Sequence, residues 1–186
     1  MADKQLSALT AAAALADADL LYVSQGGNSR KATAAQVKTY AGGLIGALVK
    51  KAADQTAANY TSSTNVAWDA EGYDTHAFHD NATNNSRLTV PAGQGFTYAQ
   101  VTVNLRIQSL TSDVFAFVGI NKNGSSSFDG AAGSICDISN TNVNLCAATP
   151  WVSVTDGDYF EAALIVQTDT SIDIIAARSS FAIVCR

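Results

Sequence analysis

Residues 59–186 show the alternation of apolar and polar positions that is typical of β-strands. In the stretch 96–109, apolar Val101, Val103, Leu105 and Ile107 alternate with polar residues, which places them on one face of a strand. Shorter apolar runs follow at near-regular spacing, separated by turns rich in Asn, Asp, Gly and Ser. The predicted strands are 60–67, 73–78, 86–90, 96–109, 114–121, 134–138, 149–154, 159–168, 172–175 and 180–185. This pattern predicts an all-β sandwich or barrel.

The first 58 residues follow other patterns. A β-rich run at 20–24, a Gly/Asn turn at 25–29 and a short run at 30–32 predict a hairpin. Thr33 and Gln36 then fit a capping box, which predicts a helix up to the glycine pair at 42–43. Residues 44–58 have helical composition, with four residues at heptad-like spacing, and predict a linker or stem helix. The expected domains are therefore a module at 1–43, a stem at 44–58 and a β domain at 59–186.

Three predicted strands are apolar on both faces. In 114–120, for example, Phe115 and Phe117 lie on the face opposite Val118 and Ile120. A strand of an ordinary sandwich shows a polar outer face, so an apolar outer face needs a second partner. We therefore expect an oligomer.

Residues 6–37, which begin with the apolar entry Leu6-Ser7-Ala8-Leu9, resemble a short module found near the N-termini of bacteriophage structural proteins. The resemblance lies in Ala16-Asp17-Ala18-Asp19-Leu20-Leu21-Tyr22-Val23, followed after a Gly/Asn turn by Arg30-Lys31-Ala32-Thr33-Ala34-Ala35-Gln36-Val37. Such modules belong to tail fibres, head fibres and related appendages. The resemblance implies attachment to a virion through Leu20, Tyr22, Val23, Arg30, Lys31, Thr33, Gln36 and Val37. A generic hairpin followed by a helix is the alternative reading of the same residues.

The β region resembles the C1q/TNF-like jelly-roll family. The resemblance lies, in order, in Ser86-Arg87-Leu88-Thr89-Val90-Pro91, Gly95-Phe96-Thr97-Tyr98, Val118-Gly119-Ile120-Asn121-Lys122-Asn123-Gly124, Val154-Thr155-Asp156-Gly157-Asp158-Tyr159-Phe160 and Ser179-Ser180-Phe181-Ala182-Ile183-Val184. Residues 134–148 do not align with the family pattern. The resemblance implies a compact, non-catalytic jelly-roll homotrimer. We expect its interface at Phe115, Phe117, Tyr159, Ile165, Phe181 and Ile183.

Charge and composition argue against some classes of function. A net charge of −5 without a basic stripe argues against nucleic-acid binding, and no apolar run approaches the length of a membrane helix. The start of the chain lacks the pattern of an export signal. We expect Cys136, Cys146 and Cys185 to be free thiols, with one disulfide as the alternative.

The sequence offers little for catalysis or for metal binding. His76 and His79 would point to opposite faces of a strand, and the acidic residues Asp69, Glu71 and Asp74 read more readily as a solvated turn than as a calcium loop. Phosphate-loop and nucleophile patterns are absent from the sequence. We therefore expect no enzymatic activity, no cofactor and no metal site.

Together these patterns favour a phage structural protein assembled in the bacterial cytoplasm and located on the virion. Residues 1–43 would bind the major capsid protein or another virion protein. The trimeric jelly roll would decorate or stabilise the capsid, or adhere to a host glycan or receptor. The alternatives are a receptor-binding tip of a tail appendage and, more remotely, a carbohydrate-active enzyme that uses Trp68 or Trp151.

Overall fold

The computed structural model describes residues 20–25, 28–33, 44–108, 114–125, 133–138, 142–167 and 171–186. The chain divides into two compact units, Met1–Gly43 and Leu44–Arg186. In the first unit, β1 (Leu20–Gln25) pairs antiparallel with β2 (Asn28–Thr33), so the predicted hairpin is present. The helix expected after Thr33 lies outside the described residues.

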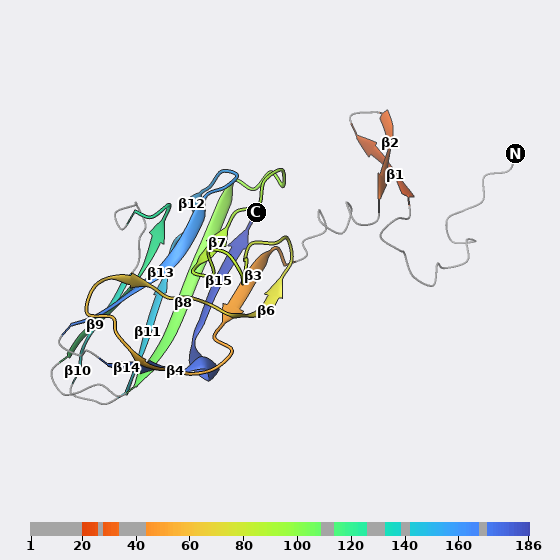
Figure 1. Cartoon of the computed structure of the whole chain (residues 1–186). Coiled ribbons are helices and arrows are strands. Elements are labelled where there is room, and N and C mark those ends of the chain that lie inside the picture. Colours follow the sequence, from red (N-terminus) through yellow and green to blue (C-terminus); the bar gives the residue numbers. More distant parts are fainter. Residues whose placement is uncertain are drawn as a thin grey trace, which may run out of the picture. The chain divides into compact units, whose positions relative to one another are not determined.

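The regular secondary structure of the second unit is almost entirely β-strand (Figure 1). They are β3 (Gly46–Lys50), β4 (Gln55–Ala58), β5 (Thr64–Asn65), β6 (Ala70–Asp74), β7 (Arg87–Thr89), β8 (Tyr98–Gln108), β9 (Val114–Lys122), β10 (Gly133–Ile138), β11 (Asn142–Ala148), β12 (Val152–Ser153), β13 (Tyr159–Gln167), β14 (Ile172–Ile174) and β15 (Ser180–Cys185). One turn of 3-10 helix, η2 (Ala176–Arg178), precedes β15.

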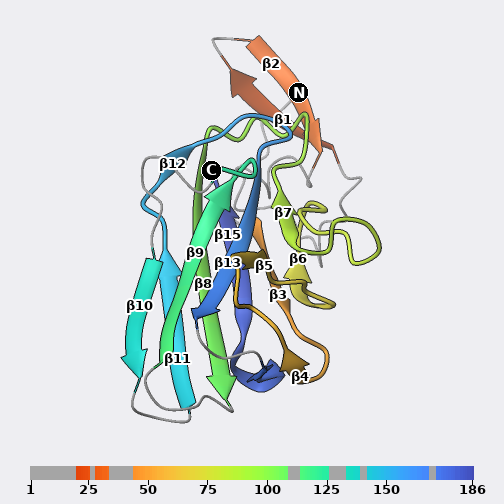
Figure 2. The ribbon, with the colours of Figure 1, turned by 60° about the vertical axis from the view of Figure 1, so that its left-hand side comes forward.

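The strands form two antiparallel sheets that face each other, as Figure 2 shows for β9 and β13 in front of β8 and β15. The five-stranded sheet has the order β10-β9-β13-β5, with β7 also paired to β13. The eight-stranded sheet has the order β4-β14-β8-β15-β3-β6, with β11 and β12 also paired to β8. Strands far apart in sequence, such as β3 and β15, are neighbours within one sheet. The predicted jelly-roll sandwich is confirmed.

The core lies between the sheets and follows the period-two pattern of the strands. In β8, the residues Val101, Val103, Leu105 and Ile107 are fully or almost fully buried, as the alternation predicts. The ring of Trp68 stacks on that of Phe181, with centroids 5.7 Å apart. The alternate residues of β8 and the buried residues of both sheets together form one continuous core.

The stem helix predicted at 44–58 is wrong, because these residues form β3 and β4. Ala47 and Val49 are fully buried, and β3 pairs with β15 on one side and β6 on the other. Two heptads supply too little helical stability to compete with two ladders of backbone hydrogen bonds and a buried face. The jelly roll therefore begins at residue 44 rather than 59.

Two other predicted strands differ from the observed strands in length or position. Within 60–67 only Thr64–Asn65 pair, and the strand expected at 73–78 occupies Ala70–Asp74. It ends there because the Asp74 carboxylate accepts the backbone N–H groups of His76, Phe78 and His79 at 3.2, 3.0 and 2.9 Å. The strand β11, which sequence reasoning missed, occupies the stretch that did not align with the family pattern.

Candidate interaction surfaces

The residues predicted to attach the chain to a virion lie largely on the hairpin β1–β2. The register pairs Leu20 with Thr33, Tyr22 with Lys31, and Val23 with Arg30. The pairing of β1 with β2 therefore brings six of the eight predicted residues into adjacent positions. The other two, Gln36 and Val37, lie outside the described residues.

Two of the six residues predicted for the trimer interface are core residues instead. Phe181 and Ile183 have no solvent-exposed surface in a single chain, because they lie on the inner face of β15. Phe181 contacts Trp68 across the core. Side chains enclosed within one chain cannot contact another chain, so this part of the prediction is wrong. The outer face of β15 instead carries Ala182 and Val184, both half-buried.

The other four residues lie on the outer face of the five-stranded sheet, which we call the aromatic face: Phe115, Phe117, Tyr159 and Ile165. Phe115 is 36% exposed, and Phe117, Tyr159 and Ile165 are half-buried. The strand register places Phe117 opposite Ile165. The aromatic face therefore offers an apolar strip along β9 and β13 that the single chain covers only in part.

An ion pair organises one end of the aromatic face. Glu161 is buried, and its carboxylate accepts hydrogen bonds from Arg87 Nε at 3.1 Å and from Ser86 Oγ at 2.9 Å. The same guanidinium lies over the ring of Tyr159, 4.1 Å from its centroid. Because a cation already covers one face of this ring, Tyr159 has less surface for a second chain than the two phenylalanines.

The outer face of the eight-stranded sheet is a second candidate surface that sequence reasoning did not find. Cross-strand pairing aligns Leu48, Ala182, Thr102 and Ala148 in one row across four strands. The exposed Asn104 and Cys146 pair in the next row. We call this surface, made of these six residues, the small-residue face. None of these six side chains is charged, although Lys50 continues the row of Asn104 and Cys146 through Ser180. Apart from Leu48, the six side chains are short and allow a second backbone to approach closely. The sequence could have indicated this face, because its residues alternate with the core residues of β8, β11 and β15.

A cluster of aromatic residues and arginine lies at one end of the same sheet. Tyr98 and Trp151 are 44% and 40% exposed. The guanidinium of Arg186 lies over both rings, 5.4 Å from the centroid of Tyr98 and 4.4 Å from that of Trp151. Trp, Tyr and Arg are the residue types that dominate binding energy in protein interfaces.

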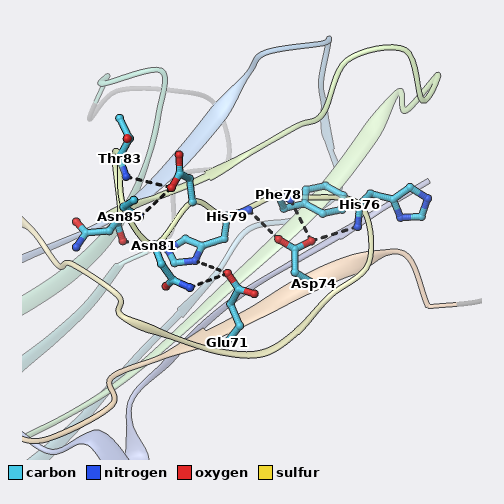
Figure 3. A network of polar contacts seen from close by, with 10 residues as sticks. Glu71, Asp74, His76, Phe78, His79, Asn81, Thr83 and Asn85 are labelled. Carbon is cyan, nitrogen blue, oxygen red and sulfur yellow. Dashed lines mark hydrogen bonds and ion pairs between the residues drawn. The ribbon is translucent and has the colours of Figure 1, made fainter.

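Of the residues considered for metal binding, Glu71, Asp74, His76 and His79 belong to a network of polar contacts (Figure 3), while Asp69 accepts the Ala52 N–H elsewhere. The buried ring of His79 lies 3.2 Å from Glu71 Oε1 through Nδ1 and 3.2 Å from the Asn85 carbonyl oxygen through Nε2. Asn81 also donates to Glu71, at 3.0 Å. Together with the Asp74 carboxylate, these bonds hold the loop between β6 and β7. Among the described residues, no group of three or more His, Cys, Asp and Glu could hold a metal ion.

Asp158 joins two turns of the five-stranded sheet. Its carboxylate accepts hydrogen bonds from Lys122 Nζ and Asn123 Nδ2, each at 2.8 Å, and from the Thr155 N–H at 2.9 Å. Burial raises the pKa of this carboxyl, but the bonds from Lys122, Asn123 and Thr155 together outweigh it, so the net pKa lies below its usual value. Asn123 and Gly124 both adopt positive φ in this turn. The arrangement is a structural clamp in which Asp158 ties Lys122 and Asn123 to Thr155.

Comparison with known proteins identifies the fold. No protein-family model and no curated protein matches the sequence. Murine APRIL at pH 5.0 aligns with 77% of this chain and 100% of its own, with 9% identity and a TM-score of 0.53. Murine APRIL at pH 8.5 aligns with 76% and 98%, with 8% identity and a TM-score of 0.51. Eiger TNF from S. frugiperda aligns with 77% and 92%, with 11% identity and a TM-score of 0.42.

At these identities the APRIL alignments show a common fold. None of the comparisons indicates an enzyme family. Within the described residues, no helix has the length and apolar character needed to cross a membrane. The chain from residue 44 onward has the jelly-roll fold of TNF-like proteins.

Proposed function

We propose that this chain is a non-enzymatic bacteriophage virion protein. Residues 1–43 attach it to a capsid protein or another virion protein, and the jelly roll is displayed on the particle surface. The observation that carries the proposal is the division into a hairpin unit and a jelly-roll unit. The hairpin unit contains the phage-like sequence pattern, while the jelly-roll unit gathers no metal cluster among its described residues.

We further propose that the displayed head is a homotrimer, as the C1q/TNF-like sequence pattern implies. Two faces compete for the contact between chains. The aromatic face offers larger apolar side chains, and burial of each Phe or Ile contributes roughly 1.5–3 kcal/mol. The small-residue face is favoured by its short side chains and by the greater width of its sheet. Display of many trimers on one particle would multiply weak binding to a surface.

Paired variants distinguish the two faces. Phe115→Ser removes apolar surface from the aromatic face, and Thr102→Arg places a charge in the centre of the small-residue face. Both positions are on outer faces, so each variant is expected to leave the core intact. If the aromatic face is the contact, light scattering will show a lower mass for Phe115→Ser alone. If the small-residue face is the contact, Thr102→Arg alone will dissociate the trimer.

The proposed role on the virion can be tested with purified virus particles. We expect the full chain to bind particles assembled without it, and immunogold labelling to locate it. Labels over the capsid support decoration of the head. Labels confined to the tail tip would favour the second candidate, a receptor-binding tip, which has the same architecture at a different position. Absence of the chain from purified particles would refute both.

A further inference from the structure

A hollow of about 670 Å³ lies on the outer side of the eight-stranded sheet and overlaps the small-residue face at Leu48 and Asn104. It is bounded by the end of β3, the loop 51–54 that follows it, and the segment from η2 to the start of β15. Cross-strand pairing aligns Lys50, Ser180 and Asn104 along one side. The volume falls in the range of about 300–1,000 Å³ that is typical of small-molecule sites.

The charge of this hollow differs in sign from that of the whole chain. Lys50, Lys51 and Arg178 line it, against one carboxylate, Asp54, on a chain whose net charge is −5. Asp54 is partly engaged, because its Oδ1 accepts the N–H of Ala176 at 2.7 Å. A second carboxylate, Asp69, accepts the N–H of the lining residue Ala52 at 2.6 Å. Three cations against these two carboxylates leave a local excess of positive charge, which attracts anions.

The three cations are available to a ligand in different ways. Lys51 Nζ donates to Gln55 Oε1 at 2.9 Å and to the Ala67 carbonyl oxygen at 3.0 Å. Both acceptors are neutral, so the ammonium group is held in place with its charge uncompensated and with one further N–H to donate. Lys50 and Arg178 are exposed and form no ion pair with any described residue. Their side chains can turn toward a ligand.

Neutral groups complete the lining. The Asn104 amide and the Ser180 hydroxyl can bond to hydroxyl groups, and short apolar side chains such as Ala52 and Ala177 can contact a carbon face. A ligand that combines a carboxylate, several hydroxyls and an apolar ring face matches this set. We propose that the hollow binds an acidic saccharide, with Arg178 and Lys50 contacting its carboxylate. This inference rests on the proposed display function and names the class of surface molecule that the head recognises.

The experiment titrates the full chain with trigalacturonic acid and follows the heat of binding by calorimetry. Maltotriose, which lacks carboxylates, and sodium sulfate, which lacks a sugar, are titrated in parallel. The double variant Lys50→Gln/Arg178→Gln is compared with Lys122→Gln, which removes a cation from the end of β9 in the five-stranded sheet. Because charge-assisted hydrogen bonds are the strong ones, we expect the double variant to bind trigalacturonic acid about tenfold more weakly or worse. Lys122→Gln should bind it as the unmodified chain does.

Three results would overturn the proposal. They are the absence of trigalacturonic acid binding at millimolar concentration, equal binding by the double variant, and binding of sulfate as tight as that of the saccharide. If the double variant instead loses mass in solution and the unmodified chain binds no saccharide, a second copy fills the hollow and the proposal is wrong. Particle labelling and the mass of the unmodified chain are measured separately, so the display function can stand or fail independently of the saccharide.

Discussion

Phe181 provides a direct test of whether β15 points its large side chains into the core of one chain or toward another chain. The ring is fully buried and stacks on Trp68, with centroids 5.7 Å apart and planes 19° apart. Phe115, on the aromatic face and 36% exposed, is the matched control. The variants Phe181→Ala and Phe115→Ala remove the same atoms from two different environments.

The two variants are expected to lose different amounts of unfolding free energy, because only Phe181→Ala leaves an enclosed cavity. Truncation of a core Phe to Ala costs about 3–5 kcal/mol, which combines lost transfer free energy with a cavity term. Phe115→Ala loses only the buried part of one ring and leaves no enclosed cavity, which gives about 1–2 kcal/mol. A domain of this size has a free energy of unfolding of about 5–15 kcal/mol, so Phe181→Ala can approach the limit of folding. Phe181→Leu, with an expected cost of about 1–2 kcal/mol, keeps the test informative.

Urea unfolding of the full chain, followed by tryptophan fluorescence, measures the free energy of unfolding at one protein concentration. We expect the loss for Phe181→Ala to exceed that for Phe115→Ala by at least about 1 kcal/mol. Light scattering on the folded Phe181→Leu variant should give the same mass as the unmodified chain. An unchanged free energy of unfolding together with a fall in mass would place Phe181 at an interface and refute the core assignment.

Three further predictions concern single residues. Asp158→Asn should flatten the loss of stability on acidification: the lowered pKa of Asp158 stabilises the folded chain above its ordinary pKa of 3.8, and this stabilisation disappears as pH falls through the lowered value. Urea unfolding at pH 5 and pH 3 measures it, and an equal acid dependence in the variant would exclude the clamp. In a Cys136→Ser background, a thiol reagent at pH 8 should modify exposed Cys146 readily and Cys185 only after unfolding, because Cys185 is buried and burial raises the pKa of its thiol to about 12. Slow modification of Cys146 in the folded chain would instead indicate that a second chain covers the small-residue face. Gly46→Ala should destabilise the chain by about 1–3 kcal/mol, because its Cβ would collide with the Ile183 carbonyl oxygen in β15; thermal unfolding measures this, and an unchanged midpoint would contradict the close approach of β3 and β15.

The sequence predicts the fold best where one face of a strand is buried. The strand β15 has the bounds that the pattern predicts, and β8 differs by only two residues at its start and one at its end. Alternation is strong there because the core imposes it. The missed strand β11 carries the same signal in Val143, Leu145 and Ala147, but its small and polar intervening residues weaken the β character of the stretch.

The errors arise where tertiary pairing overrides local preference. Residues 44–58 have helix-forming composition, yet β3 fills the gap between β15 and β6, and no local property encodes a partner that lies about 135 residues away. The interface prediction failed at Phe181 for a related reason. An apolar strand indicates burial, but its sequence does not tell a face buried in one chain from a face buried between chains. The small-residue face is likewise invisible until the register aligns four strands.

The central claim is that the chain displays a trimeric jelly-roll head. Light scattering coupled to size-exclusion chromatography on the full chain tests it most directly. The account predicts a mass near three times 19.3 kDa that persists on dilution. A mass near that of one chain, or of two, would contradict the trimer and leave the aromatic and small-residue faces without the proposed partner.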